Sequence, residues 1–178
     1  CNNLRSDNNT GNGWLFSGDS TRATNNFTAI SSAADTNGGI GVAFSAATGT
    51  GITNFSFIAF FSESNTGDGF DFASGITTVL RGKFFGCLAR ANSGIGYDIN
   101  LLGLDFIGSE ARDNTGDGFE IDSISTKLIG CFSVGNGVNI DLNAEDVVIS
   151  GCTFGANQVP HTANLVEENR MAVLENNI

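Results

Sequence analysis

The sequence predicts an all-β fold: a single-stranded, right-handed parallel β-helix of about seven coils with 21–28 residues in each coil. Three observations predict this fold: an asparagine that recurs every 21–28 residues, an apolar alternation that follows each asparagine, and the absence of helical periodicity within the repeating unit. The composition, with 24 Gly, 15 Phe and a single Pro, suits tight turns around a Phe-lined interior better than it suits a disordered chain.

The repeating unit reads Asn-x-Gly-x-Gly followed by an apolar, a variable and another apolar residue. Full or shortened copies begin at Asn9, Asn37, Asn65, Asn92, Asn114, Asn136 and Asn157, with spacings of 28, 28, 27, 22, 22 and 21 residues. A single coil of this length cannot bury its own apolar face, so we expect neighbouring coils to stack at about 4.8 Å. Parallel crossovers are right-handed as a rule, which gives the handedness.

Residues 1–178 are predicted to form one β-helix domain, with clear repeats over 9–157. The segment 158–178 is a last partial coil or a short cap, because 172–178 resembles 147–153; an amphipathic helix over 164–174 is the alternative. No capping element precedes the first repeat, so we expect the chain to be a segment of a longer one.

Two rows of apolar residues are predicted to point into the lumen. One row holds Trp14, Val42, Phe70, Tyr97, Phe119 and Ile140, and the other holds Phe16, Phe44, Phe72, Ile99, Ile121 and Leu142. The residue between the two rows must then face outward, because side chains alternate along a strand. We expect the asparagine itself to adopt a left-handed φ at a tight turn and its amide to bond the next coil.

A second recurring motif ends five residues before each asparagine, as in Phe84-Phe-Gly-Cys87. Cys87, Cys131 and Cys152 share its last position with Ser109 and Ser32. With one His in the chain and no Cys-x-x-Cys motif, zinc is improbable. We interpret this position as a column of small buried residues, and a Cys131–Cys152 disulfide as possible but geometrically unfavourable.

These motifs, the asparagine row and the Asn-x-Gly-x-Gly coil, resemble the right-handed parallel β-helix proteins of the pectate-lyase-like group over at least residues 9–157. That group includes polysaccharide lyases, mannuronan epimerases and bacteriophage tailspikes. The resemblance is most specific for the fold, because this scaffold hosts many chemistries. The Asp-Pro-His-Glu run of the epimerases is missing, since Phe72 follows Asp71, so no catalytic motif carries over.

The outward row between the two apolar rows becomes acidic in its later copies: Asp71, Asp98, Glu120 and Asp141. The next outward row adds Asn100, Asp122 and Asn143. Carboxylates one strand spacing apart repel one another unless water, a cation or a substrate intervenes. Asp98, Glu120 and Asp141 are candidate catalytic residues of a glycosidase or lyase. Asp71, Asp98, Asn100, Glu120 and Asp122 are candidate glycan contacts. The plain alternative is an acidic stripe that keeps the fold soluble; no resident metal is predicted, although Ca²⁺ is possible.

A third row, four residues before each asparagine, is apolar at Phe61, Leu88 and Phe132 and holds Glu110 in between. Alternation places it outside, which predicts a subunit interface. A wide three-sided lumen that encloses these residues is the alternative. Arg90 and Arg112 share another position and are expected to pair with Glu110 and Asp113 on the surface.

Function follows less directly from the sequence. A net charge of −11 disfavours nucleic acid and anionic membrane as partners, and no run of residues is apolar enough to insert in a membrane. The leading hypothesis is a structural or receptor-binding segment of a phage tailspike or tail fibre, homotrimeric, extracellular or on the virion surface, contacting host surface polysaccharide. A polysaccharide-degrading enzyme and a cell-surface adhesin or matrix protein are the alternatives.

Overall fold

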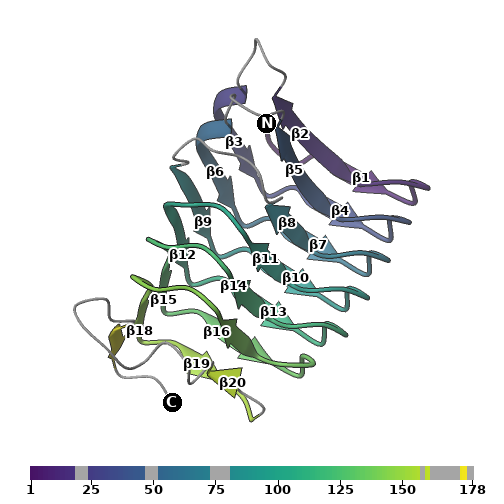
Figure 1. Cartoon of the computed structure of the whole chain (residues 1–178). Helices are drawn as coiled ribbons and strands as arrows, with labels where there is room; N and C mark the ends of the chain where they lie inside the picture. The colour runs from purple at the N-terminus through teal and green to yellow at the C-terminus, as the bar shows by residue number, and fades with distance from the viewer. Residues whose placement is uncertain (19–23, 47–51, 73–80, 157–158, 161–172, 176–178) are drawn as a thin grey trace.

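The protein is a parallel β-helix whose chain winds through three sheets in turn. The computed structural model describes residues 1–18, 24–46, 52–72, 81–156, 159–160 and 173–175. This part of the chain contains strands and turns and no helix. Each sheet holds seven parallel strands, and the coils stack along one axis (Figure 1). The predicted right-handed parallel β-helix is therefore confirmed, with three strands per coil.

The strands that follow each asparagine turn form sheet C. They are β2 (Trp14–Gly18), β5 (Val42–Ala46), β8 (Phe70–Phe72), β11 (Tyr97–Ile99), β14 (Phe119–Ile121), β17 (Ile140–Leu142) and β20 (Val159–Pro160). The apolar residues at their first and third positions are those predicted to line the lumen, and in β8, β11 and β14 they are fully buried.

Sheet A comes next along each coil. Its strands are β3 (Thr24–Ile30), β6 (Ile52–Ile58), β9 (Gly82–Phe85), β12 (Leu104–Ile107), β15 (Lys127–Ile129), β18 (Val148–Ser150) and β21 (Val173–Glu175). The pairing of β21 with β18 aligns Val173 with Val148, as the likeness between the last residues and 147–153 predicts. Asn157, the last predicted repeat asparagine, and His161, the one histidine of the sequence, lie outside the described residues.

Sheet B closes the coil. Its strands are β1 (Arg5–Asp7), β4 (Ala33–Asp35), β7 (Phe61–Glu63), β10 (Leu88–Arg90), β13 (Glu110–Arg112), β16 (Phe132–Val134) and β19 (Thr153–Phe154). Small residues at the middle of these strands, such as Ala89 and Ala111, are fully buried. Small side chains on this side leave room for the aromatic rings that come from sheets A and C.

Aromatic rings stack along the axis at nearly the strand spacing. The ring of Tyr97 lies 4.8 Å from that of Phe70 and 4.7 Å from that of Phe119, with interplanar angles of 5°. From the opposite wall, Phe84 and Phe106 stack at 4.6 Å and meet this column edge-on. In-register strands place like side chains one above another, so one repeated aromatic position yields a continuous stack.

The asparagine ladder joins the coils through buried amides. Each asparagine donates from its main-chain N–H and its Nδ2 to the Oδ1 of the next one, as Asn65 does to Asn92 at 3.0 and 2.9 Å. The same pair of bonds links Asn92 to Asn114 and Asn114 to Asn136. At Asn136 the acceptor changes to Asn139, which in turn donates to the carbonyl of Ala156.

One expectation about these turns is wrong. The residue with left-handed φ precedes the asparagine, and Ser64, Ala91 and Asp113 hold φ values of 55°, 54° and 55°. The six repeat asparagines in the described part of the chain have no positive φ. They bridge neighbouring coils with the whole amide.

The column of small residues at the corner between sheets A and B is buried as predicted. Small size is one reason for its composition, and hydrogen bonding is a second. Its members are Ser32, Cys87, Ser109, Cys131 and Cys152. Main-chain N–H groups in this column donate to the side chain one coil further on. The N–H of Cys87 donates to Ser109 Oγ at 3.4 Å, and the N–H of Ser109 donates to Cys131 Sγ. The N–H of Cys131 donates to Cys152 Sγ at 3.3 Å. Ser and Cys therefore recur here because a corner N–H needs a side-chain acceptor. All three cysteines are free thiols, and burial raises the pKa of the Cys87 thiol to about 12.

Candidate functional site

The acidic row predicted from the sequence is a registered ladder on the outer face of sheet C. Asp71 in β8 lies opposite Asp98 in β11, Asp98 opposite Glu120 in β14, and Glu120 opposite Asp141 in β17. All four are partly exposed, since the apolar residues on either side of each point into the lumen. Neighbouring carboxylates are thus one strand spacing apart, about 4.8 Å along the axis.

Two further carboxylates join the ladder from the turns that lead into sheet C. Asp68 accepts a hydrogen bond at 2.7 Å from the main-chain N–H of Ile95, and Asp117 accepts one from that of Val138. Each belongs to one coil and bonds the next, so both are fixed beside the outward row. On the other side of the row, directly after β11 and β14, Asn100 donates to Asp98 Oδ1 and Asp122 is exposed.

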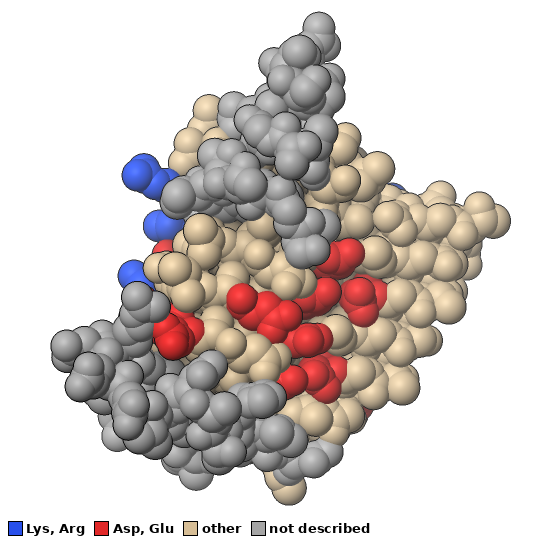
Figure 2. Space-filling model, in the orientation of Figure 1, with Lys and Arg blue, Asp and Glu red and all other residues tan. Residues whose placement is uncertain are grey.

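Figure 2 shows that acidic side chains gather in the middle of the face that sheet C presents, whereas basic side chains lie at the edge of the molecule on the side of sheet A. Among the described residues, none of the ion pairs involves a carboxylate of this group; the paired arginines Arg5, Arg90 and Arg112 all lie in sheet B. We refer to Asp68, Asp71, Asp98, Asp117, Glu120, Asp122 and Asp141 as the acidic face.

The electrostatics of the acidic face favour protonation at its centre. Burial, then repulsion from Asp71 and Glu120, raises the pKa of Asp98 to about 7. Burial and neighbouring carboxylates also raise the pKa values of Asp71, Glu120 and Asp117 above their ordinary range. The cause is common to all: each carboxylate is partly removed from water and set beside others of the same charge.

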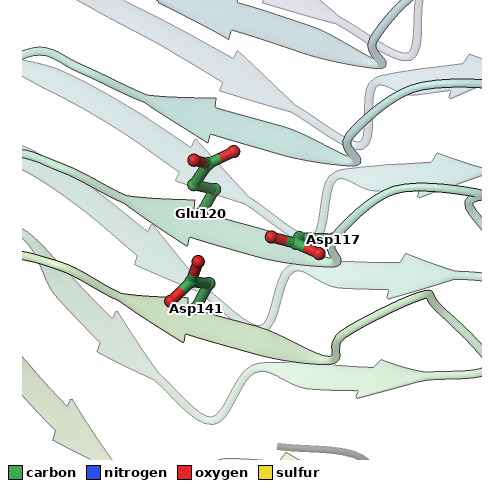
Figure 3. Close-up of side chains that lie close together, drawn as sticks. All are labelled: Asp117, Glu120 and Asp141. Carbon is green, nitrogen blue, oxygen red and sulfur yellow. The ribbon is translucent and has the colours of Figure 1, made fainter. Parts of the chain in front are cut away.

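One end of the acidic face has the chemistry of a cation site. Asp117, Glu120 and Asp141 each offer a carboxylate oxygen, and these oxygens lie within 4.8 Å of one another (Figure 3). Asp141 Oδ1 has almost no accessible surface and no hydrogen-bond partner. Oxygen ligands at partly hydrated positions suit Ca²⁺ or another hard cation. The sequence analysis predicted Glu120 and Asp141 as site residues but missed Asp68 and Asp117. Both precede the first inward-facing residue of a sheet C strand by two positions, and this recurrence could have identified them.

The apolar row Phe61, Leu88 and Phe132 lies on the outer face of sheet B, in register with Glu110. Phe61 is 42% exposed, while Leu88 and Phe132 are half-buried. The guanidinium of Arg112 covers the Phe132 ring, with Cζ 4.6 Å from its centroid. The lumen does not enclose these residues, so the three-sided lumen is not their explanation.

Arg90 and Arg112, the two arginines that the sequence places at one repeat position, pair on the surface, one of them with an unforeseen partner. Arg112 pairs with Glu110 at 2.7 Å as expected, whereas Arg90 pairs with Glu63 on the preceding coil at 3.0 Å. Glu63 stands directly opposite Arg90 in the sheet, so register decides the pairing rather than closeness in sequence.

Comparison of the sequence with protein-family models and with curated proteins finds no match. No helix in the described ranges is long and apolar enough to span a membrane.

Proposed function

We propose that this β-helix is a rigid structural and receptor-binding segment, extracellular or on a virion surface, that contacts host surface polysaccharide through the acidic face of sheet C. The observation that carries the proposal is the registered ladder of Asp71, Asp98, Glu120 and Asp141, unopposed by any basic side chain in the described part of that face.

The ladder is suited to a polymer of sugars. It presents hydrogen-bond acceptors at regular intervals along the axis, and Asn100 and Asn143 extend it with amides that both donate and accept. Sugar hydroxyls and amino groups are donors, so a neutral or cationic glycan laid along the axis can bond at successive coils. The stacked core holds the acceptors at fixed spacing, which lowers the ordering cost of binding.

We also propose that the segment belongs to a tailspike-like or tail-fibre-like homotrimer, assembled through Phe61, Leu88 and Phe132. These residues form an outward apolar row on sheet B, and large apolar side chains left outside a sheet favour association. Light scattering on a size-exclusion column tests this proposal: a stable trimer supports it, and a monomer at high protein concentration contradicts it. A cell-surface adhesin or matrix protein would use the same rigid coils.

A second candidate is glycoside hydrolysis, which the raised pKa of Asp98, about 7, favours. A general acid must hold its proton near neutral pH while a nearby carboxylate stays ionised. Retaining glycosidases place the two carboxyl groups about 5–5.5 Å apart, close to the spacing of ladder neighbours. Release of reducing ends from polysaccharides by wild type, and its loss in Asp98→Asn and Glu120→Gln, would establish this activity.

Binding of the purified chain to a panel of immobilised neutral, amino and acidic polysaccharides tests the main proposal. We expect at least one neutral or amino polysaccharide to bind without shortening. Failure of every polysaccharide at micromolar protein and low salt would contradict it.

A further inference from the structure

The outer face of sheet A differs from that of sheet C, because it carries cations that the described part of the protein leaves unpaired. In the strand register, Lys83 of β9 lies opposite Asp105 of β12, and Asp105 opposite Lys127 of β15. Both lysines are exposed, and among the described residues no ion pair of 4 Å or less includes them or Asp105. The row thus alternates positive, negative and positive along the axis.

At one end of this row the surface is hollowed into a pocket of about 390 Å³. It is lined by Asn54, Phe55, Ser56, Arg81 and Lys83. Arg81 is exposed and, like Lys83, forms no ion pair with a described residue. A guanidinium, an ammonium, an amide and a hydroxyl at one opening are the donors that a carboxylate or sulfate group requires.

An apolar row runs beside the charged row on the same sheet. Two residues beyond Lys83, Asp105 and Lys127 come Phe85, Ile107 and Ile129, also aligned in register. Ile107 and Ile129 are 36% and 42% exposed, and Phe85 is half-buried. A sugar chain presents C–H faces as well as polar groups, so a charged row flanked by an apolar row matches both.

We propose that the outer face of sheet A binds a linear anionic polysaccharide in which a charged sugar alternates with a neutral one. The anionic groups would meet the Arg81–Lys83 pocket and Lys127, which are two strand spacings apart, about 9.6 Å. The neutral sugar between them would donate hydroxyls to Asp105. This surface is separate from the acidic face of sheet C and does not depend on it.

The test uses hyaluronan oligosaccharides as the probe, with neutral dextran oligosaccharides as the matched control, measured by calorimetry at low salt. We expect hyaluronan to bind and dextran not to bind. Lys83→Gln and Arg81→Gln should each weaken binding about fivefold, the upper range for one exposed charge pair. Arg90→Gln removes the same charge from sheet B and should change nothing. The acidic-face variant Glu120→Gln should also leave hyaluronan binding intact, so failure here and failure of the sheet C proposal are distinguishable.

The role of Asp105 gives the sharpest comparison. A polygalacturonate oligosaccharide carries a carboxylate on every sugar, and one of these would face Asp105, so it should bind more weakly than hyaluronan. Asp105→Asn removes the repulsion between these two carboxylates and should bring the affinity for polygalacturonate closer to that for hyaluronan. The proposal is overturned if hyaluronan does not bind, or if Lys83→Gln and Arg90→Gln weaken hyaluronan binding equally. It is also overturned if single-stranded DNA binds as tightly as hyaluronan, since the surface would then attract any polyanion.

Discussion

The main-chain N–H of Cys131 donates a hydrogen bond to the Sγ of Cys152 at 3.3 Å, across the step from one coil to the next. Cys131 Sγ in turn accepts the N–H of Ser109. The corner column is thus a second ladder of side-chain acceptors, parallel to the asparagine ladder on the other edge of sheet B. Its members are exchangeable only with residues that keep an acceptor at the same place.

Replacing Cys131 with Ser should therefore be tolerated, whereas Cys131→Ala should destabilise the fold. Serine retains an acceptor for the Ser109 N–H, while alanine leaves that buried donor unpaired at a cost of about 1–3 kcal/mol. Urea unfolding of the two variants measures the difference. Equal destabilisation by Ser and Ala would show that the column is selected for size alone.

Asn92→Ala should be among the most damaging single substitutions. The Asn92 side chain accepts from both the N–H and Nδ2 of Asn65 and donates to Asn114 and to the carbonyl of Ser62. Its loss leaves several buried groups unpaired, so we expect more than about 3 kcal/mol of destabilisation. The exposed neighbour Ser93→Ala is the control and should change the free energy of unfolding little. Similar unfolding midpoints for both variants would contradict a stabilising ladder.

Tyr97→Phe should stabilise the protein by about 1 kcal/mol, because the Tyr97 hydroxyl is fully buried without a hydrogen-bond partner. A phenyl ring keeps the stacks with Phe70 and Phe119. Thermal unfolding should show a higher midpoint. A lower one would mean that the hydroxyl has a partner in solution, such as a bound water.

The effect of replacing a glycine at the asparagine turn with alanine should depend on the space around that glycine. A Cβ at Gly41 would collide with Ser62 Oγ and lie 2.6 Å from Asn65 Nδ2, whereas one at Gly11 would meet nothing within 4 Å. Gly41→Ala should therefore lower the free energy of unfolding by about 3 kcal/mol or more, several times the effect of Gly11→Ala. Comparable unfolding curves would show that the coils can separate locally to admit a methyl group.

Stability should fall as the pH rises from about 4 to above 7. The folded protein holds the Asp98 proton more tightly than the unfolded chain, because the pKa of Asp98 is raised to about 7. The stabilisation is thus complete below the unfolded pKa and lost as the pH passes the folded one. Asp98→Asn should flatten this slope and be more stable than wild type at pH 8, and Asp105→Asn on sheet A is the control. An unchanged slope in Asp98→Asn would contradict the assignment.

Sequence periodicity is sufficient for most of the fold, because an in-register solenoid maps residue spacing directly onto space. The inward rows through Phe70, Tyr97 and Phe119 and the outward row through Asp98 and Glu120 follow from alternation alone. The position of Asp117 beside Glu120 does not, since it depends on the path of a turn. The sheet A surface was also missed: Lys83 and Lys127 are 44 residues apart in the sequence, and only the stacking of β9, β12 and β15 brings them to one face.

The measurement that most directly tests the proposed function is the affinity of an Asp98→Asn/Glu120→Gln double variant for the neutral or amino polysaccharide that wild type binds best in the panel. The control is Asp105→Asn, which removes one carboxylate from sheet A instead. If the acidic face is the contact, the double variant loses about tenfold or more in affinity, with an unchanged unfolding midpoint or a higher one, and the control does not. Equal affinity of wild type and the double variant would place the polysaccharide elsewhere and contradict the account.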